Sequence, residues 1–128
     1  MIKIPISYVD YNGGERTEDY CFHLNKAELA EMQLTTDGGM DVMIDRIVKS
    51  KDQKELIALF KKILFMSYGE KSPDGKRFIK SSELSLAFSQ TEAYANLFMD
   101  LATDEEKAVK FVNGILPPDL AEKANKNN

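Results

Sequence analysis

The residues of this chain whose types and spacing best suit nucleophilic catalysis are Cys21 and His23, its only cysteine and its only histidine. On a β-strand, side chains two positions apart lie on the same face, so the histidine could reach the thiol. A working pair also needs a group that orients the histidine. Hairpin strands usually carry such residues as half-buried packing or as polar side chains facing solvent. We therefore interpret both as structural and predict that the chain is not an enzyme.

Acidic side chains occur at spacings that could attract a metal ion. Asp37, Asp41 and Asp45 would lie along one flank of a helix, but a hard cation needs ligands that converge from several directions. Asp100 and residues 104–106 lie where a helix is expected to begin, and acids are favourable at that end of the helix dipole. Solvated helix faces explain both groups. One histidine and one cysteine also exclude paired-histidine and thiolate zinc sites, so no metal is predicted.

The glycine pairs could bind phosphate only within a glycine-rich loop between a strand and a helix. Gly13-Gly14 is flanked by expected strands, and Gly38-Gly39 is not followed by the Lys-Ser or Lys-Thr of a phosphate loop. We interpret them as turn and capping glycines. The sequence therefore predicts no nucleotide and no other cofactor.

Charge is unevenly distributed along the chain. Residues 1–45 carry nine acids and three bases, residues 46–80 four acids and ten bases, and residues 81–128 eight acids and four bases. A basic middle between acidic ends suits contact with nucleic acid, contact between protein subunits, or simply charged helix faces in water. The overall charge of −4 disfavours nucleic acid as a partner.

Within the basic middle, the segment 71–80 combines four cations with Phe78 and Ile79. A basic loop with an aromatic ring can stack single-stranded nucleic acid, but one ring is thin support. Phe78-Ile79 could equally anchor the loop on the core, leaving a surface for a protein partner or a solubilising connector. The candidate partner-binding residues are Lys61, Lys62, Lys71, Lys76, Arg77 and Lys80.

The elements that would position these residues begin with a β-hairpin. Apolar residues alternate with polar ones or proline along 2–8 and again along 20–24, which is the period of half-buried strands. Asn12-Gly13-Gly14 supplies the residues that a tight reversal needs. Pro5 cannot donate a hydrogen bond to a neighbouring strand, which predicts an edge position or a bulge there.

From Asn25 onward, apolar residues recur at helical spacing. One stripe follows residues 40–48, and a broader one along 56–65 predicts a central, deeply buried helix. Helices are predicted to begin at the pairs Asn25 with Glu28, Ser50 with Gln53, and Thr103 with Glu106, and at Ser81 or Ser82. A break between two helices is predicted near Gln90-Thr91. The last helix is predicted to end at a C-cap formed by Asn113-Gly114.

Together these patterns predict an α+β fold, with an N-terminal β-hairpin at 1–24 and a bundle of about five α-helices at 25–116. Residues 67–80 are expected to form the longest irregular stretch, and 117–128 a flexible tail. No linker divides the chain, so we predict one domain over 1–128. No apolar run is long enough to span a membrane, and the N-terminus lacks the pattern of a signal peptide.

Three stretches resemble a known family when taken together: LTTDGGMDVMIDRIVKSKDQKELIALFKKIL, SYGEKSPDGKRFIKSSEL and QTEAYANLFMDLATDEEKAVKFVNGILP. Their most specific parts are Ser67-Tyr68-Gly69, residues 72–78, and the Gln90–Tyr94 start of a helix. They are similar to the small tail assembly chaperones of long-tailed phages and prophages of Gram-positive bacteria, roughly over residues 8–117. These are likenesses of sequence and assign no role to single residues.

The resemblance implies a role without catalysis. Such chaperones coat the long helical tape measure protein, keep it soluble, and help deliver the tail tube subunits that displace them. Many are made in two lengths, and this chain would be the short form, with the tail tube protein contacted through a longer, frameshifted form. The resemblance also implies self-association and action in the cytoplasm of the bacterial host, outside the mature virion. The alternative is a small phage or prophage regulatory protein that binds a host protein or nucleic acid through residues 46–80.

Overall fold

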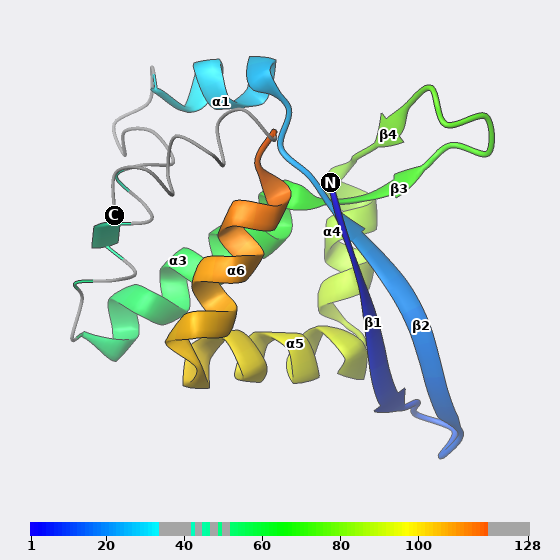
Figure 1. Ribbon diagram of the computed structural model, residues 1–128. Helices are drawn as coiled ribbons and strands as arrows, with labels where there is room; N and C mark the ends of the chain where they lie inside the picture. Colours follow the sequence, from blue (N-terminus) through cyan, green and yellow to red (C-terminus); the bar gives the residue numbers. More distant parts are fainter. Residues whose placement is uncertain (34–41, 43–44, 47–48, 50–51, 118–128) are drawn as a thin grey trace.

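The computed structural model describes residues 1–33, 42, 45–46, 49 and 52–117 of the chain. It confirms the predicted α+β class, with an N-terminal antiparallel hairpin followed by five helices among the described residues (Figure 1). The strands are β1 (Ile2–Val9), β2 (Glu15–Phe22), β3 (Tyr68–Lys71) and β4 (Phe78–Ile79). The helices are α1 (Lys26–Gln33), α3 (Gln53–Ser67), α4 (Ser82–Ser89), α5 (Glu92–Thr103) and α6 (Glu105–Ile115).

Strands β1 and β2 form the predicted hairpin. They pair antiparallel from Ile2 opposite Phe22 to Val9 opposite Glu15. Between them Gly13 has a φ of +84°, in the left-handed region that favours glycine. Exposed and more buried residues alternate along β1, and the apolar side of β1 packs against α5 and α6. The alternation seen in the sequence is therefore the alternation between core and solvent.

A second, shorter hairpin lies in the segment 67–80, so the prediction of an irregular stretch there was wrong. Strand β3 pairs with both β4 and the end of β2, which gives one sheet in the order β1-β2-β3-β4. Strands of four and two residues are too short to show an alternating pattern. Gly69 allows β3 and β4 to approach each other closely, because a Cβ there would lie 2.6 Å from Phe78 Cε2 and 2.7 Å from the Ile79 carbonyl oxygen.

Three helices begin where the sequence predicts. The Glu28 N–H donates to Asn25 Oδ1 at 2.8 Å and the Asn25 N–H donates to Glu28 Oε1 at 3.0 Å, which confirms the capping box of α1. Ser81 caps α4 by accepting from the Leu84 N–H at 3.0 Å. Thr91 caps α5, at the predicted break between α4 and α5.

Two predicted N-terminal boxes were wrong. Helix α3 is capped by Asp52, which accepts from the Lys54 N–H, and not by Ser50. Helix α6 is capped by Asp104, which accepts from two backbone N–H groups of the first turn, while Thr103 ends α5. In both places an aspartate follows the predicted cap closely. Its carboxylate caps the helix, and its negative charge is also stabilising near the positive end of the helix dipole.

The predicted C-cap at Asn113-Gly114 was also wrong, because α6 continues to Ile115 and ends with Leu116 as its cap. Gly114 is needed inside the helix for packing. A Cβ on Gly114 would lie 2.6 Å from Ile2 Cδ1 and 3.2 Å from Ile2 Cβ, so glycine lets β1 approach α6 closely.

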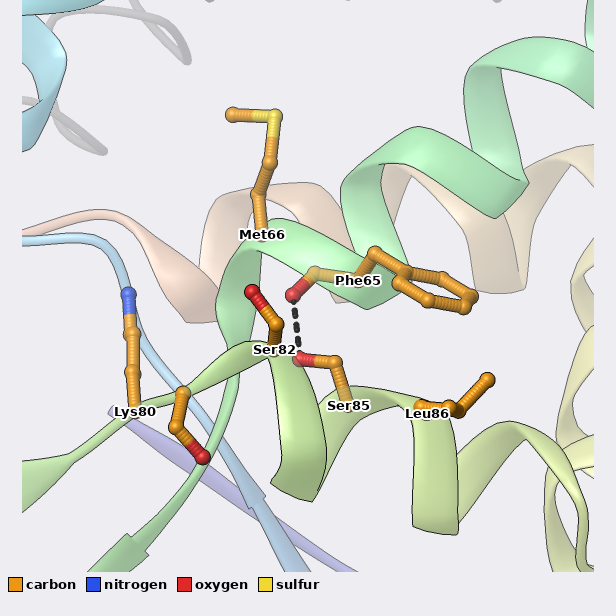
Figure 2. Close-up of a pocket in the computed structure, with 7 residues that line it drawn as sticks. Phe65, Met66, Lys80, Ser82, Ser85 and Leu86 are labelled. Carbon is orange, nitrogen blue, oxygen red and sulfur yellow. Dashed lines mark hydrogen bonds between the residues drawn. The ribbon is translucent and has the colours of Figure 1, made fainter.

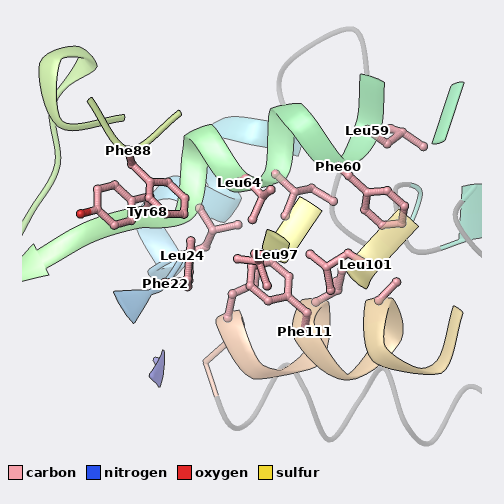
Figure 3. Close-up of a cluster of buried hydrophobic side chains, with 14 of the residues drawn as sticks. Phe22, Leu24, Leu59, Phe60, Leu64, Tyr68, Phe88, Leu97, Leu101 and Phe111 are labelled. Carbon is pink, nitrogen blue, oxygen red and sulfur yellow. The ribbon is translucent and has the colours of Figure 1, made fainter. Parts of the chain in front are cut away.

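The core lies where β2 and β3 meet the helices. The ring of Phe22 is fully buried, and its centroid lies 5.7 Å from those of Tyr68 and Phe88 and 5.2 Å from that of Phe111 (Figure 3). Tyr68 and Phe88 stack with centroids 4.4 Å apart. The cluster thus joins β2, β3, α4 and α6, and buried leucines of α3 and α5 extend it.

Some sequence predictions lie outside the described residues. They are the helix along 40–48, of which only scattered positions are described, the glycine pair Gly38-Gly39, the aspartates Asp37 and Asp41, and the tail beyond Pro117.

Candidate protein-binding site

A largely apolar groove lies between the C-terminal end of α3 and the N-terminal half of α4. It has a volume of about 590 Å³ and is open to solvent along much of its length. Phe65 and Met66 of α3 form one wall and Leu86 of α4 the other, with serines of α4 between them (Figure 2). The Ser85 hydroxyl donates to the Phe65 carbonyl at 2.9 Å, which ties the two helices together beneath the groove.

Sequence reasoning missed this groove, although a signal for it was present. The apolar stripe of α3 is wider than one buried face requires. Its central residues, such as Ile63 and Leu64, are buried as predicted, but Ile57 remains 46% exposed and Phe65 only half-buried. Leu86 on α4 is 54% exposed. The extra width of the stripe predicts deeper burial, but in the structure part of the stripe is exposed.

Lys80, a predicted partner-binding residue, lies at one end of this groove. Its ammonium pairs with the Glu28 carboxylate at 2.6 Å and lies 5.7 Å from the centre of the Phe78 ring. Both charged side chains of the pair are largely covered, so the bond holds α1 against the strand that leads into α4. Lys80 therefore has a structural role as well as its place at the groove.

Lys61 and Lys62 are exposed on α3, one turn before Phe65 and Met66. Residues four apart on a helix are neighbours on its surface, so these two cations continue the α3 wall of the groove. Among the six predicted partner-binding residues, Lys80 lines the hollow, and Lys61 and Lys62 lie one helical turn away from its α3 wall.

Lys71, Lys76 and Arg77 lie apart from that hollow, on the β3–β4 hairpin that projects from the body of the protein (Figure 1). Its turn is held by Asp74, whose carboxylate accepts from the Ser72 hydroxyl at 2.6 Å and from the Lys76 N–H at 3.0 Å. These hydrogen bonds hold the pKa of Asp74 below its usual value. The six predicted residues therefore form two separate groups.

Cys21 and His23 lie at the end of β2 and just after it. Burial lowers the pKa of His23, and the nearby N-terminal amine and Lys80 lower it further. Its Nδ1 is buried without a hydrogen-bond partner among the described residues, and its ring stands edge-on to Phe78. Among the described residues no carboxylate is hydrogen-bonded to the imidazole, whose ring is packed against Phe78.

No described helix is both long enough and apolar enough to cross a membrane. No curated protein and no solved structure matches the chain. A family model described as phage tail assembly chaperone matches it over residues 1–128, the entire sequence. That match agrees with the resemblance found in the sequence and with a surface suited to protein contact. The chain therefore belongs to the phage tail assembly chaperone family.

Proposed function

We propose that this protein binds the tape measure protein during tail assembly of a long-tailed phage or prophage of a Gram-positive host. It keeps that long helical client soluble and helps to recruit tail tube subunits, the latter through a longer, frameshifted form. It acts in the host cytoplasm, associates with itself along the client, and needs neither cofactor nor catalysis. The observation that carries the proposal is the family match over residues 1–128.

The groove between α3 and α4 supports a binding role of this kind. An amphipathic helix binds by laying its apolar face into a hydrophobic groove. Phe65, Met66 and Leu86 supply such a surface, and Lys61 and Lys80 lie beside it. We propose that a client helix docks here, with apolar residues on the groove and acidic residues toward the lysines.

The first test is co-expression of this protein with the adjacent tape-measure reading frame, followed by affinity purification at low and at high salt. We expect the long protein to become soluble and to co-purify. It should remain bound at high salt, because salt screens attraction between charges and does not weaken the burial of apolar surface. If the long protein stays insoluble and unbound, the proposal is wrong, and the regulatory alternative through residues 46–80 moves ahead. A nucleic-acid complex would instead weaken steeply as salt rises.

The groove itself is tested by Leu86→Glu, with Met99→Glu on α5 as its matched control. Leu86 and Met99 are 54% and 55% exposed, so both variants add one charge at an equally exposed apolar position. We expect Leu86→Glu to weaken client binding by roughly tenfold or more, as for the loss of an apolar anchor, and Met99→Glu to leave it unchanged. Equal effects of the two variants would place the client elsewhere.

A further inference from the structure

The first edge of the sheet, along β1, is closed to another strand. Pro5 has no N–H to donate. The Asn96 side-chain amide of α5 donates to the Ser7 carbonyl at 3.1 Å, so this backbone acceptor is already used. Helix α5 contacts the same strand and runs across its direction (Figure 1). These are the usual means by which proteins prevent edge-to-edge pairing.

The opposite edge, along β2, is open over most of its length. Strand β2 pairs with β3 only at Cys21 opposite Gly69 and Phe22 opposite Tyr68. No described segment pairs with this edge from Glu15 to Tyr20. These six residues span about 20 Å of extended backbone. Figure 1 shows the reason, since the two hairpins diverge from their common base.

The angle between the diverging hairpins holds a groove of about 440 Å³. Tyr20 and Tyr68 line it, with ring centroids 6.3 Å apart. Its charged residues are the acids Glu18, Asp19 and Glu70 and one base, Lys71. Hydrogen bonds from Tyr8 and Tyr20 lower the pKa of Glu18, so this carboxylate is ionised near neutral pH. The groove thus combines aromatic surface, open strand edge and net negative charge.

We propose that the open edge of β2 binds an extended, basic segment of a partner protein, which adds to the sheet as a further strand. In this mode the backbone supplies hydrogen bonds and alternate side chains supply specificity. Here apolar side chains on one face of the segment would contact Tyr20 and Tyr68, and Lys or Arg side chains on its other face would lie near Asp19. Glu70, on the same face as Tyr68, adds negative charge at the end of the groove. This site is separate from the groove between α3 and α4 and does not depend on the identity of the client there.

A second copy of this chain fits the edge less well. The distal part of β2 carries three acids, Glu15, Glu18 and Asp19, and one base, Arg16. Arg16 is already engaged within its own hairpin, 2.6 Å from Asp10 and 3.5 Å from Glu18. The stretch from Glu15 to Tyr20 carries three acids and one base, so pairing two copies would bring together two surfaces of the same net negative sign, which is unfavourable. The charge therefore favours a basic partner.

The test uses a dye-labelled octapeptide of alternating Lys and Val, whose binding to the full chain is followed by fluorescence anisotropy. We expect saturable binding and slower hydrogen exchange of the backbone amides between Glu15 and Tyr20. Two further peptides carry N-methyl groups on every second residue, in the two possible phases. N-methylation of alternate residues removes the N–H donors along one edge of an extended peptide. At least one of the two methylated peptides should therefore fail to bind, because its blocked edge is the one that would face β2.

Charge is tested with the double variant Asp19→Lys/Glu70→Lys and the matched control Glu31→Lys/Asp100→Lys, which makes the same charge change at exposed positions outside the groove. The first should weaken binding of the Lys–Val peptide by roughly tenfold or more and gain binding of a Glu–Val peptide; the control should do neither. The proposal is wrong if no peptide binds. It is also wrong if both N-methylated peptides bind as tightly as the unmethylated one. The proposal is likewise overturned if the protein is a dimer and Asp19→Lys/Glu70→Lys dissociates it, because a second copy of the chain would then occupy the open edge of β2. None of these outcomes bears on co-purification of the tape measure protein.

Discussion

The folded protein favours the neutral form of the His23 side chain. Burial lowers its pKa, the N-terminal amine and Lys80 lower it further, and only Glu28 acts in the opposite direction. Its ring contacts Phe78 edge-on, and its Nδ1 has no hydrogen-bond partner among the described residues. A proton on this imidazole would therefore place a positive charge beside two others in a partly desolvated site.

The consequence is a loss of stability as pH falls. In the unfolded chain His23 takes up a proton near pH ~6.5, whereas the folded chain takes it up only at lower pH. Stability is full above the unfolded pKa and falls as pH drops from there toward the folded pKa. We expect the free energy of unfolding, measured in urea, to fall between pH 7.5 and 5.5 (roughly the range above carboxylate titration), and to fall less in His23→Leu. Equal losses in both proteins would contradict this.

At the scale of single elements, Asp104 serves two helices, because it ends α5 and caps α6. Its carboxylate accepts from the Glu106 and Lys107 N–H groups at 3.0 and 3.3 Å. Asp104→Ala should lower the free energy of unfolding by about 1 kcal/mol, while Asp104→Asn should keep most of it because an amide oxygen still accepts these bonds. Urea denaturation of the two variants checks this. A loss in Asp104→Asn as large as in Asp104→Ala would mean that charge, and not capping, is what stabilises α6.

Long elements of this fold could be predicted from the sequence, whereas helix ends and short strands could not. The hairpin and the long helices could be predicted, because alternation over eight residues and apolar stripes over several turns are averages that one residue cannot disturb. Helix ends depend on single residues, and Asp52 and Asp104 replaced caps predicted only a few positions away. Strands as short as β3 and β4 carry no period, and tertiary contacts at Gly69 determine them.

The candidate site could be predicted only in part. Lys80 was predicted from its charge and lines the groove between α3 and α4, whereas Lys61 and Lys62, predicted on the same ground, lie one helical turn away from it on α3. Phe65 belongs to the stripe along 56–65 that predicts a deeply buried helix, because a sequence shows the width of a stripe but not how much of it another element covers. Leu86, which is 54% exposed, was not singled out by the sequence patterns at all. The open edge of β2 depends on where β3 diverges, which no local pattern encodes.

At the scale of the whole molecule, the aromatic cluster should make the protein unfold as one unit. Phe22 contacts Tyr68, Phe88 and Phe111, so a single side chain joins the sheet to α4 and α6. We propose that residues 1–128 form one domain for this reason. Far-ultraviolet circular dichroism and the near-ultraviolet signal of the tyrosines should then report the same transition, and Phe22→Ala should lower the free energy of unfolding by about 3–5 kcal/mol.

Two separate transitions in those signals would contradict a single domain. The conservative variant Phe22→Leu serves as the control, because it keeps most of the buried volume and should lose less stability than Phe22→Ala. The chain has no tryptophan, so the near-ultraviolet signal comes chiefly from its five tyrosines.

The strand order β1-β2-β3-β4 also has a consequence for the speed of folding. Each hairpin brings together residues that are close in the chain, and such hairpins form within microseconds. Only the short junction of Phe22 with Tyr68 and of Cys21 with Gly69 joins the two, across a long stretch of sequence. Closing that loop costs entropy before it gains contacts. We therefore expect the junction to form in the rate-limiting step, so that substitutions there slow folding, while substitutions at the hairpin tips mainly speed unfolding.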